Sequence, residues 1–389
     1  MSDIAVLKAW ARSRDPDAIE YAEAVFKEYQ EFCDSDKWGF SHNAFAYNSM
    51  INCYAKSKHP DAANRALKLF ERMKANMGNP GWELCFADIY TYTSLIDTLG
   101  KQQSYDASEQ AVSLLTEVEE LFVKTGDIRF QPNIRLYTAA VNAIGRSHEK
   151  PDRAKAIVKR VESSYLKGDA GKESTPDVVF YNALINAYGW SNEEGRSRQS
   201  FKILKHMIAL YKSGKIVNAK PDTVSFNSVL NACVYDENDD QNQDHTMIEI
   251  VVAIFELLCN SEEYGRPDQH TYVQVLDSIS RHMAEEDETR TAMAEATFLQ
   301  CASNGLVGPR VVQRLHALIP QSRFQTMMGS ASTGDGRKLN FRSNFDVSKL
   351  PLSWTCNAQS QNSRNRRRSR SRRMQSNFQV TKNVLISST

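Results

Sequence analysis

The chain has 389 residues and a formal net charge of +1, with 41% hydrophobic and 24% charged residues. These proportions are typical of a soluble globular protein. No apolar run reaches the roughly 18 residues of a membrane helix, which excludes a membrane-spanning segment and a membrane partner.

The charge is unevenly distributed along the chain. Residues 331–389 hold 12 basic and 2 acidic residues, so residues 1–330 carry a net charge of −9. An acidic region of this size does not attract nucleic acid by bulk charge, and any such binding requires a local face. The seven cysteines form no C-x-x-C pair, which predicts buried free thiols in a reducing compartment.

Residues 1–42 read as a degenerate N-terminal repeat. The segment ARSRDPDAIEYAEAVF from Ala11 aligns with AKSKHPDAANRALKLF from Ala55, and only a stub of a first helix precedes it. The first residues do not look like a signal or transit peptide. Two interpretations stay open: a capping unit, or a late start that has lost an upstream targeting segment.

The region 43–310 repeats one pattern six times. The stretch DVVFYNALINAY from Asp177 recurs from Asn43, Asp88, Asn133, Asp222 and Asp268. The residues that follow its aromatic are 45, 45, 44, 45 and 46 positions apart. A fixed period of this size indicates a stacked repeat array.

Each unit reads as two helices. Asn or Asp opens the first helix, because its side chain can accept a hydrogen bond from a free backbone N–H. In the first unit this helix is expected over residues 44–56. In the second helix of four units, a small residue lies eighteen positions after the residue that follows the pattern's aromatic. We expect these small residues at close contacts between helices. They are Ala66, Ala111, Ala156 and Ser200.

The end of the chain departs from the pattern. The acidic stretch DENDDQNQD at 236–244 predicts a mobile surface loop. Residues 311–325 predict a capping helix. Residues 326–389 predict a disordered Arg/Ser-rich tail, in which SRNRRRSRSRRM at 363–374 holds seven arginines. The charge of this run suits phosphate binding or nuclear import, and a merely solvated end is an equal alternative.

The Y-N-x-L-I-N-A-Y first helix, the A-x-x-L-F second helix and the closing Pro-Asp resemble the pentatricopeptide repeat, with long units of about 45 residues. The tetratricopeptide alternative lacks its W-x-x-L-G signature. The resemblance implies an all-α, right-handed α-solenoid of stacked helix-turn-helix repeats. It also implies sequence-selective binding of single-stranded RNA, one base per unit.

The resemblance further implies which residues read the bases. The pair is the residue after the aromatic and the last residue of the same unit. The pairs are Asn48 with Asp88, Thr93 with Asn133, Thr138 with Asp177, Asn182 with Asp222, and Asn227 with Asp268. Val273 with Arg310 does not match a family pair. By family pairing, the five units spell U-A-G-U-U.

Side chains just after each cap are expected to flank the bases. They are Phe45, Tyr90, Arg135, Val179, Val224 and His270. Capping alone would also explain the Asp and Asn residues, but not the recurrent Asn or Thr after the aromatic. The aromatics themselves (47, 92, 137, 181, 226 and 272) are expected in the core.

The sequence predicts no enzyme. It contains no metal-ligand spacing, no phosphate loop and no deaminase signature, so we expect no metal, no cofactor and no catalytic residue. We expect a monomer that binds RNA, with other RNA-processing proteins as further partners. The family resemblance implies a mitochondrion or plastid and a role in RNA processing, stability or translation. The competing hypothesis is a protein-binding scaffold.

Overall fold

The computed structural model describes residues 2–10, 12–13, 17–35, 41–57, 59–169, 171–236, 247–285, 287–329 and 350–358. Within these ranges the regular elements are helices and no strand occurs, apart from one isolated parallel bridge between Asn43 and Leu84. The chain divides into two compact units, Met1–Asn238 and Asp239–Thr389. A single array over 43–310 had been expected. The division falls at the acidic loop of the fifth repeat, where residues 237–246 lie outside the described ranges.

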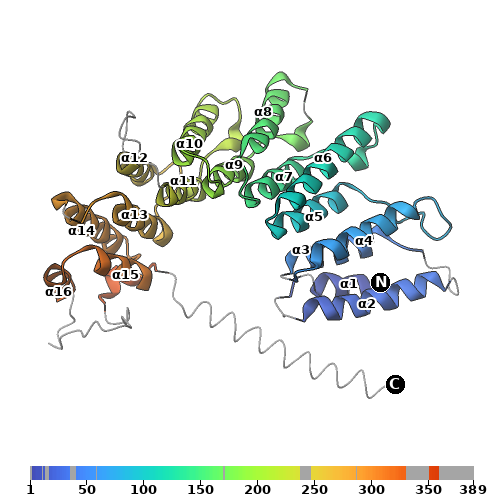
Figure 1. Cartoon of the computed structure of the whole chain (residues 1–389), viewed down its shortest axis with the longest axis horizontal. Coiled ribbons are helices and arrows are strands. Elements are labelled where there is room, and N and C mark those ends of the chain that lie inside the picture. The colour runs from blue at the N-terminus through green and yellow to red at the C-terminus, as the bar shows by residue number, and fades with distance from the viewer. Residues whose placement is uncertain are drawn as a thin grey trace, which may run out of the picture. The chain divides into compact units, whose positions relative to one another are not determined.

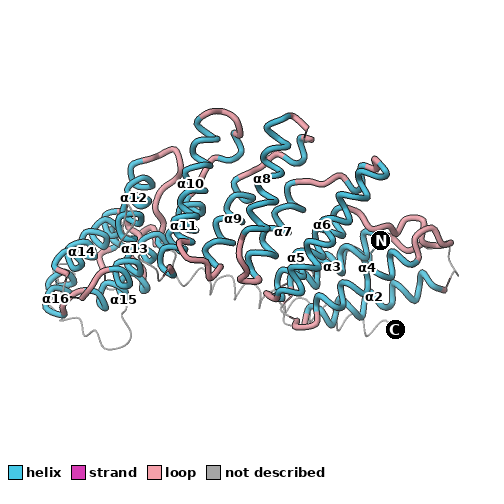
Figure 2. The backbone as a smooth tube through the Cα atoms, turned by 45° about the horizontal axis from the view of Figure 1, so that its top comes forward, coloured by secondary structure: helices cyan, strands magenta, loops and turns pink. Residues whose placement is uncertain are grey.

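The first unit is a series of antiparallel helix pairs followed by one further first helix (Figure 2). The all-α helical-repeat prediction is therefore confirmed. The helices are α1 (Ser2–Trp10), α2 (Ala18–Asp34), α3 (Ala44–Lys56), α4 (Ala62–Ala75), α5 (Ile89–Leu99), α6 (Tyr105–Thr125), α7 (Ile134–Arg146), α8 (Asp152–Lys167), α9 (Val178–Trp190), α10 (Arg196–Lys212) and α11 (Thr223–Tyr235). The expected bounds of the helix at 44–56 are those of α3.

The first helices of successive repeats form one layer of this unit. Helix α3 packs on α5, α5 on α7, α7 on α9, and α9 on α11 (Figure 1). Small residues allow a close approach, as at Gly100 against Ala143 and Gly145 against Ala187. The second helices form the other layer, because α4, α6, α8 and α10 each contact the first helix of their own repeat and of the next.

Aromatic side chains fill the space between the two layers. Tyr47, Tyr92, Tyr181 and Phe226 are fully or almost fully buried, as expected, whereas Tyr137 is half-buried. Burial of side chains of this size is a large part of the hydrophobic stabilisation of each repeat. The aromatic of the pattern is therefore a core residue in these repeats, with Tyr137 as the half-buried exception.

The expected close contacts of the second helices are confirmed at Ala66, Ala111 and Ser200, all fully buried. They are wrong at Ala156, which is exposed. Ala154 is buried there instead, sixteen residues after Thr138 rather than eighteen. The register of α8 is therefore shifted by two residues relative to the other three second helices.

The extra length of each repeat lies in the second helix and in the linker after it. Three linkers contain a 3-10 turn that ends three residues before the next cap: η2 (Ile128–Phe130), η3 (Lys172–Ser174) and η4 (Val217–Ala219). Successive linkers also touch. Ser174 Oγ donates to Pro132 O at 2.8 Å, and the Arg129 guanidinium lies 4.3 Å from the Phe86 ring. The linkers thus add a second set of contacts between neighbouring repeats.

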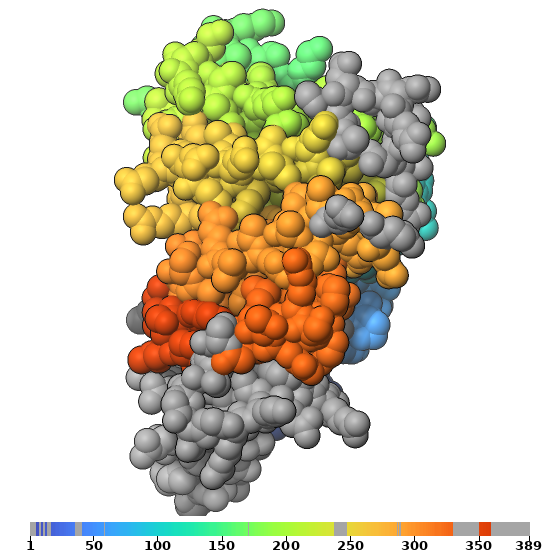
Figure 3. Space-filling view, turned by 90° about the vertical axis from the view of Figure 1, so that its left-hand side faces the viewer, coloured from blue at the N-terminus to red at the C-terminus, as the bar shows by residue number. Residues whose placement is uncertain are grey.

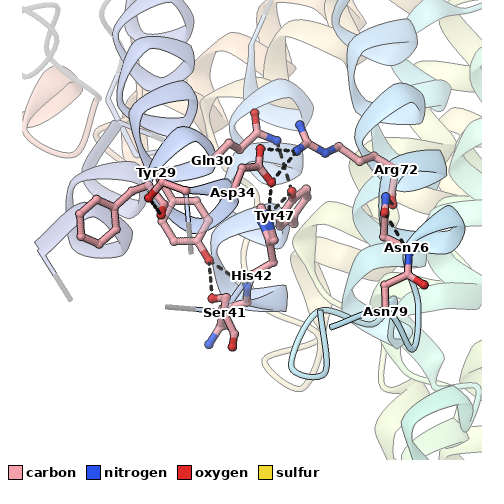
Figure 4. A network of polar contacts seen from close by, with 12 residues as sticks. Tyr29, Gln30, Asp34, Ser41, His42, Tyr47, Arg72, Asn76 and Asn79 are labelled. Carbon is pink, nitrogen blue, oxygen red and sulfur yellow. Dashed lines mark hydrogen bonds and ion pairs between the residues drawn. The ribbon is translucent and has the colours of Figure 1, made fainter. Parts of the chain in front are cut away.

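A buried histidine joins three helices at the start of the first unit (Figure 4). His42 Nε2 lies 2.9 Å from Asp34 Oδ1, and its Nδ1 lies 3.3 Å from Tyr47 Oη. Arg72 donates to Asp34 Oδ2 at 3.0 Å, and the ring of His42 stacks on Trp82 at 3.9 Å. These contacts fasten the degenerate N-terminal pair to the first complete repeat.

The second unit contains α12 (Met247–Asn260), α13 (Gln269–His282), α14 (Glu288–Ser303), α15 (Pro309–Leu318), α16 (Gln321–Gly329) and α17 (Leu352–Thr355). The capping helix expected over 311–325 is two helices, α15 and α16. They are separated at Pro320, whose ring restricts the residue before it. Helix α16 continues into the stretch expected to be disordered.

A short segment of the expected tail, residues 350–358, is ordered and packs on the second unit. Figure 3 shows it in red beside the orange end of that unit. The Trp354 ring meets Phe298 edge-on at 5.6 Å, and Trp354 O accepts from Val307 N at 2.8 Å. Asn357 N donates to Gly305 O at 2.8 Å. We call this segment the C-terminal clasp. The arginine run at 363–374 lies outside the described residues.

Five of the seven cysteines are buried, Cys259 is half-buried and Cys356 is exposed. Burial raises the pKa of the Cys53 thiol to about 11, which keeps it protonated and unreactive near neutral pH. Among the helices described, none has the length and apolar character needed to cross a bilayer.

Candidate nucleic-acid interface

The caps predicted from sequence are present at the first helices. Asp88 accepts from Tyr90 N and Thr91 N, and Asn133 accepts from Leu136 N. Asn43, Asp177, Asp222 and Asp268 cap their helices in the same way. Capping fixes each of these side chains at a helix N-terminus, where backbone N–H groups and the helix dipole favour negative charge.

The residues two places after each cap are exposed. Phe45 and Tyr90 are 65% and 63% exposed, although both are large aromatic side chains. Val179 and Val224 are 56% and 57% exposed, and Arg135 and His270 are also exposed. A recurrent exposed apolar position is costly in water unless something covers it. This row is therefore available to flank a ligand.

The residues that follow the aromatics become more enclosed along the chain. Asn48, Thr93 and Thr138 are half-buried, whereas Asn182 and Asn227 are each only 7% exposed. In the second unit Val273 is also buried. These side chains lie five residues after the cap, so each first helix presents the cap and this residue in its N-terminal half.

The first predicted pair is joined by a hydrogen bond. Asn48 Nδ2 donates to Asp88 Oδ1 at 3.2 Å, across two neighbouring first helices. Thr91, three residues after the cap, also belongs to this group, since its Oγ1 lies 2.6 Å from Asn48 Oδ1. The sequence reasoning had not singled out Thr91.

The two threonine pairs are arranged differently. Thr93 Oγ1 donates to Ile89 O at 2.7 Å, and Thr138 Oγ1 donates to Ile134 O at 2.7 Å. Each hydroxyl is thus bonded to its own helix. No hydrogen bond in the described part of the chain joins Thr93 to Asn133 or Thr138 to Asp177.

The fourth pair contains an open hydrogen-bond acceptor. The amide oxygen of Asn182 is buried and has no hydrogen-bond partner within the described residues. Leaving a buried acceptor unpaired costs about 1–3 kcal/mol. A ligand that donates a hydrogen bond to Asn182 would remove this cost. The fifth pair is divided, because Asn227 belongs to the first unit and Asp268, which is exposed, to the second.

Cations follow the row of first helices at its other end. Lys56, Lys101 and Arg146 each lie eight residues after the half-buried Asn or Thr of their helix. Partial desolvation, and then the positive charge of Arg146, lower the pKa of Lys101. The carboxylate of Asp97 lies near Lys101 and Arg146 and offsets part of their charge, so these residues form a mixed face with a local excess of positive charge. The regular spacing of the cations is visible in the sequence but had not been noticed there.

Within the described ranges, no group of three or more His, Cys, Asp or Glu side chains is arranged to hold a metal ion. The polar groups of the first-helix row are instead amides, hydroxyls and carboxylates that hydrogen-bond one another or the backbone. Such a row suits recognition of hydrogen-bonding groups on a ligand.

Comparisons with known proteins point to one family. The family model described as the PPR repeat matches residues 45–76, which cover most of α3 and all of α4. The crystal structure of the pentatricopeptide repeat protein PPR10 from maize is similar, with a TM-score of 0.42 and 16% sequence identity. That match covers 87% of this chain and 45% of the maize chain, so this chain spans less than half of that chain's length. No curated protein matches by sequence.

Proposed function

Because this chain is a pentatricopeptide repeat protein, we propose that it binds single-stranded RNA in a sequence-selective way. Each complete repeat holds one base between the exposed residues that follow successive caps. The edge of the base meets the pair formed by the residue after the aromatic and the next cap. Stacking on Phe45 and Tyr90 and hydrogen bonds to the pair supply affinity and selectivity.

The observation that carries this proposal is the hydrogen bond between Asn48 and Asp88. It joins two residues that are 40 positions apart and lie on neighbouring first helices. Capping of α5 requires only Asp88, and packing of α3 requires no amide at Asn48. The contact therefore supports a shared role of the two side chains beyond helix formation.

The cations at the far ends of these helices are suited to the RNA backbone. Lys56, Lys101 and Arg146 lie on α3, the turn after α5, and α7, and they are spaced one per repeat. A phosphate placed between neighbouring repeats would meet positive charge, while the remainder of the acidic surface would repel RNA. This combination confines RNA to the row of first helices.

The test changes one base preference and little else. Asn133→Asp turns the second pair into Thr with Asp, and Asp caps α7 as well as Asn does. Binding is measured to UAGUU and UGGUU placed within a neutral single strand. We expect the preferred second base to move from A to G, by roughly tenfold in the ratio of affinities.

A matched control is available in the same chain. Asn43→Asp makes the same chemical change at a cap that completes no reading pair. It should leave the preference for the second base where it was. If Asn133→Asp is folded and the preference stays on A, or if neither RNA binds better than a scrambled strand, base reading is wrong and a protein-binding scaffold becomes the better account.

The proposed biological role is to act by occupancy of a transcript rather than by catalysis. We propose an organelle, mitochondrion or plastid, as the compartment, and an effect on RNA processing, stability or translation. Five readable bases give limited selectivity, so other RNA-processing proteins are proposed to extend the bound site. Crosslinking and sequencing of RNA bound to the protein in its own cells would identify the transcript and the compartment.

A further inference from the structure

Three of the caps have a hydroxyl residue three positions later, and these three complete the pairs that contain Asn. Thr91 follows Asp88, Ser225 follows Asp222, and Thr271 follows Asp268. In each case the hydroxyl accepts a hydrogen bond from the backbone N–H of the cap, at 3.0–3.2 Å. The two caps that complete Thr pairs are followed at this position by the apolar Leu136 and Phe180. The hydroxyl therefore accompanies the Asn pairs and is absent from the Thr pairs.

The geometry around Thr91 shows where its single hydrogen goes. Its Oγ1 lies 3.0 Å from Asp88 Oδ1 and 2.6 Å from Asn48 Oδ1. Asp88 Oδ1 already accepts from Tyr90 N, Thr91 N and Asn48 Nδ2. A carboxylate oxygen so fully occupied is a poor fourth partner, and the shorter distance favours Asn48. The Thr91 hydroxyl thus accepts from Asp88 N and donates to the Asn48 amide oxygen.

These contacts fix the orientation of the Asn48 side chain. The amide NH2 faces the carboxylate of Asp88, and the amide oxygen faces the hydroxyl of Thr91. A rotation of the amide by 180° would place its oxygen against the carboxylate oxygen of Asp88, and the Thr91 hydroxyl would have to turn its hydrogen away from Asn48 toward Asp88. One N–H and one lone pair of Asn48 remain unused, and their order is set by Asp88 and Thr91 together.

We propose that Thr91 is a third member of the first reading pair, a positioning residue that lets Asn48 distinguish uracil from cytosine. This inference rests on the proposed function. Uracil offers an N3–H donor beside a carbonyl acceptor, whereas cytosine offers an N3 acceptor beside an amino donor. An amide held in one orientation matches one of these patterns. An amide free to rotate matches both.

Ser225 has the same place beside Asn182 in the fourth pair. Its hydroxyl accepts from Asp222 N at 3.2 Å and lies 3.0 Å from Asp222 Oδ1, while the amide oxygen of Asn182 has no partner. Among the described residues no hydrogen bond joins Ser225 to Asn182, so the contact between Thr91 and Asn48 has no counterpart in the fourth pair.

The test compares Thr91→Val, which removes the hydroxyl and keeps the branched shape, with Thr91→Ser, which keeps the hydroxyl. Binding is measured to UAGUU and CAGUU within a neutral single strand. We expect the original chain and Thr91→Ser to prefer U. In Thr91→Val the ratio of affinities for U and C should fall toward one, a drop of roughly tenfold. A folded Thr91→Val that keeps the original ratio overturns the proposal.

Thr271→Val is the matched control for loss of a capping box. It removes the equivalent hydroxyl from the cap of α13, in the other compact unit, and should leave discrimination at the first base unchanged. Equal loss of the ratio in both variants would mean that helix stability, and not amide orientation, sets the preference, and it would overturn the proposal.

A measurement on the unaltered chain covers the case in which Thr91→Val does not fold. The Nδ2 proton of Asn48 that faces Asp88 should exchange with solvent at least tenfold more slowly than the amide protons of the exposed Asn218. Equal exchange would show that the amide is not held. The Asn133→Asp swap, measured in parallel, separates the two hypotheses. If it moves the second base and Thr91→Val leaves the first unchanged, base reading stands and the role of Thr91 fails.

Discussion

Gly145 of α7 lies against Ala187 of α9 so closely that a Cβ added to Gly145 would come 2.9 Å from the Cα of Ala187. Real Cβ atoms are not found this close to backbone atoms, so the two helices depend on the missing side chain. This contact, and its counterpart at Gly100 and Ala143, sets the distance between neighbouring first helices.

We therefore expect Gly145→Ala to destabilise the first unit by about 1–3 kcal/mol, since the overpacked methyl group outweighs the better helix propensity of Ala. Gly189→Ala is the matched control, because its added Cβ would lie 3.4 Å from Ala232 Cβ, an ordinary contact. Its effect should be neutral or stabilising by up to about 1 kcal/mol. Urea unfolding of both variants measures the difference. If Gly145→Ala and Gly189→Ala changed the free energy of unfolding equally, the close approach of Gly145 to Ala187 would be contradicted.

A second pair of variants tests the register of the second helices. Ala111 of α6 is fully buried between layers, whereas Ala156 of α8 is exposed. Ala111→Trp should overpack the interface and cost a few kcal/mol, while Ala156→Trp should change the free energy of unfolding by less than about 0.5 kcal/mol. If Ala156→Trp were as damaging as Ala111→Trp, the two-residue shift of α8 would be wrong.

A third prediction concerns pH at the contact between α8 and α10. Glu162 accepts from Tyr181 Oη at 2.7 Å, and its Oε2 lies 3.0 Å from His206 Nε2. The hydrogen bond to this carboxylate raises the pKa of His206 above its ordinary value, although partial burial opposes the rise. The resulting stabilisation is fully present below about pH 6.5 and is lost as the pH rises through the folded-state pKa.

Titration of the histidine ring signals by NMR measures this effect. The midpoint of His206 should lie above about 6.5 and should fall toward it in Glu162→Gln. His42 is the internal contrast, because burial lowers its pKa despite the hydrogen bond to Asp34. His42 should therefore titrate below about 6.5. An unchanged His206 midpoint in Glu162→Gln would show that the carboxylate is not the cause. Since the His206 side chain is about half exposed, its contribution to stability is small.

The fourth prediction separates the C-terminal clasp from the arginine run beyond it. Deleting 359–389 should leave thermal unfolding unchanged, because the contacts of Trp354 and Asn357 remain. Deleting 350–389 should destabilise the second unit by about 1–3 kcal/mol, since Val307 N loses its acceptor and Phe298 its aromatic neighbour.

The shorter deletion also tests the arginines as phosphate ligands. If they bind RNA, their loss should weaken binding and reduce the salt slope by about 0.7 for each phosphate contact removed. Identical binding curves before and after the deletion would exclude the run from RNA binding. Identical unfolding of both deletion variants would show that the clasp adds no stability.

Much of the fold followed from local rules. An Asn or Asp before an apolar helical pattern predicted every cap from Asn43 to Asp268, because capping depends on residues two or three positions away. The aromatic that recurs at one position of each pattern likewise predicted residues of the core. The period of the pattern then implied stacking of neighbouring repeats, and the contacts between successive first helices agree with it.

Other features depend on contacts that no local pattern encodes. The register of α8 was missed because a fixed count from Thr138 assumes that every second helix turns the same positions toward its neighbours, whereas in α8 Ala154 is buried and Ala156 is exposed. The clasp was missed because residues 350–358 have no helical periodicity and are ordered by distant partners such as Phe298.

The sequence predicted which positions belong to the candidate site, but it did not predict which hydrogen bonds their side chains make. The hydroxyls of Thr93 and Thr138 bond to their own helices, a local alternative that competes with a partner on the next helix. The burial of Asn182 and the contact of Thr91 with Asn48 arise only when neighbouring helices pack. The residue type at each position was therefore readable, whereas the state of each hydrogen bond was not.

The Gly–Ala contacts between first helices have a consequence for the RNA itself. Helices in such contact have axes roughly 8 Å apart, whereas nucleotides along one strand of a duplex are about 3.4 Å apart. A strand read one base per helix must therefore be stretched, with its bases separated from one another. If this chain binds RNA as proposed, any hairpin that includes the target bases has to open first, and folding of the RNA competes with binding. The stability of that hairpin would then decide how much of the transcript is occupied.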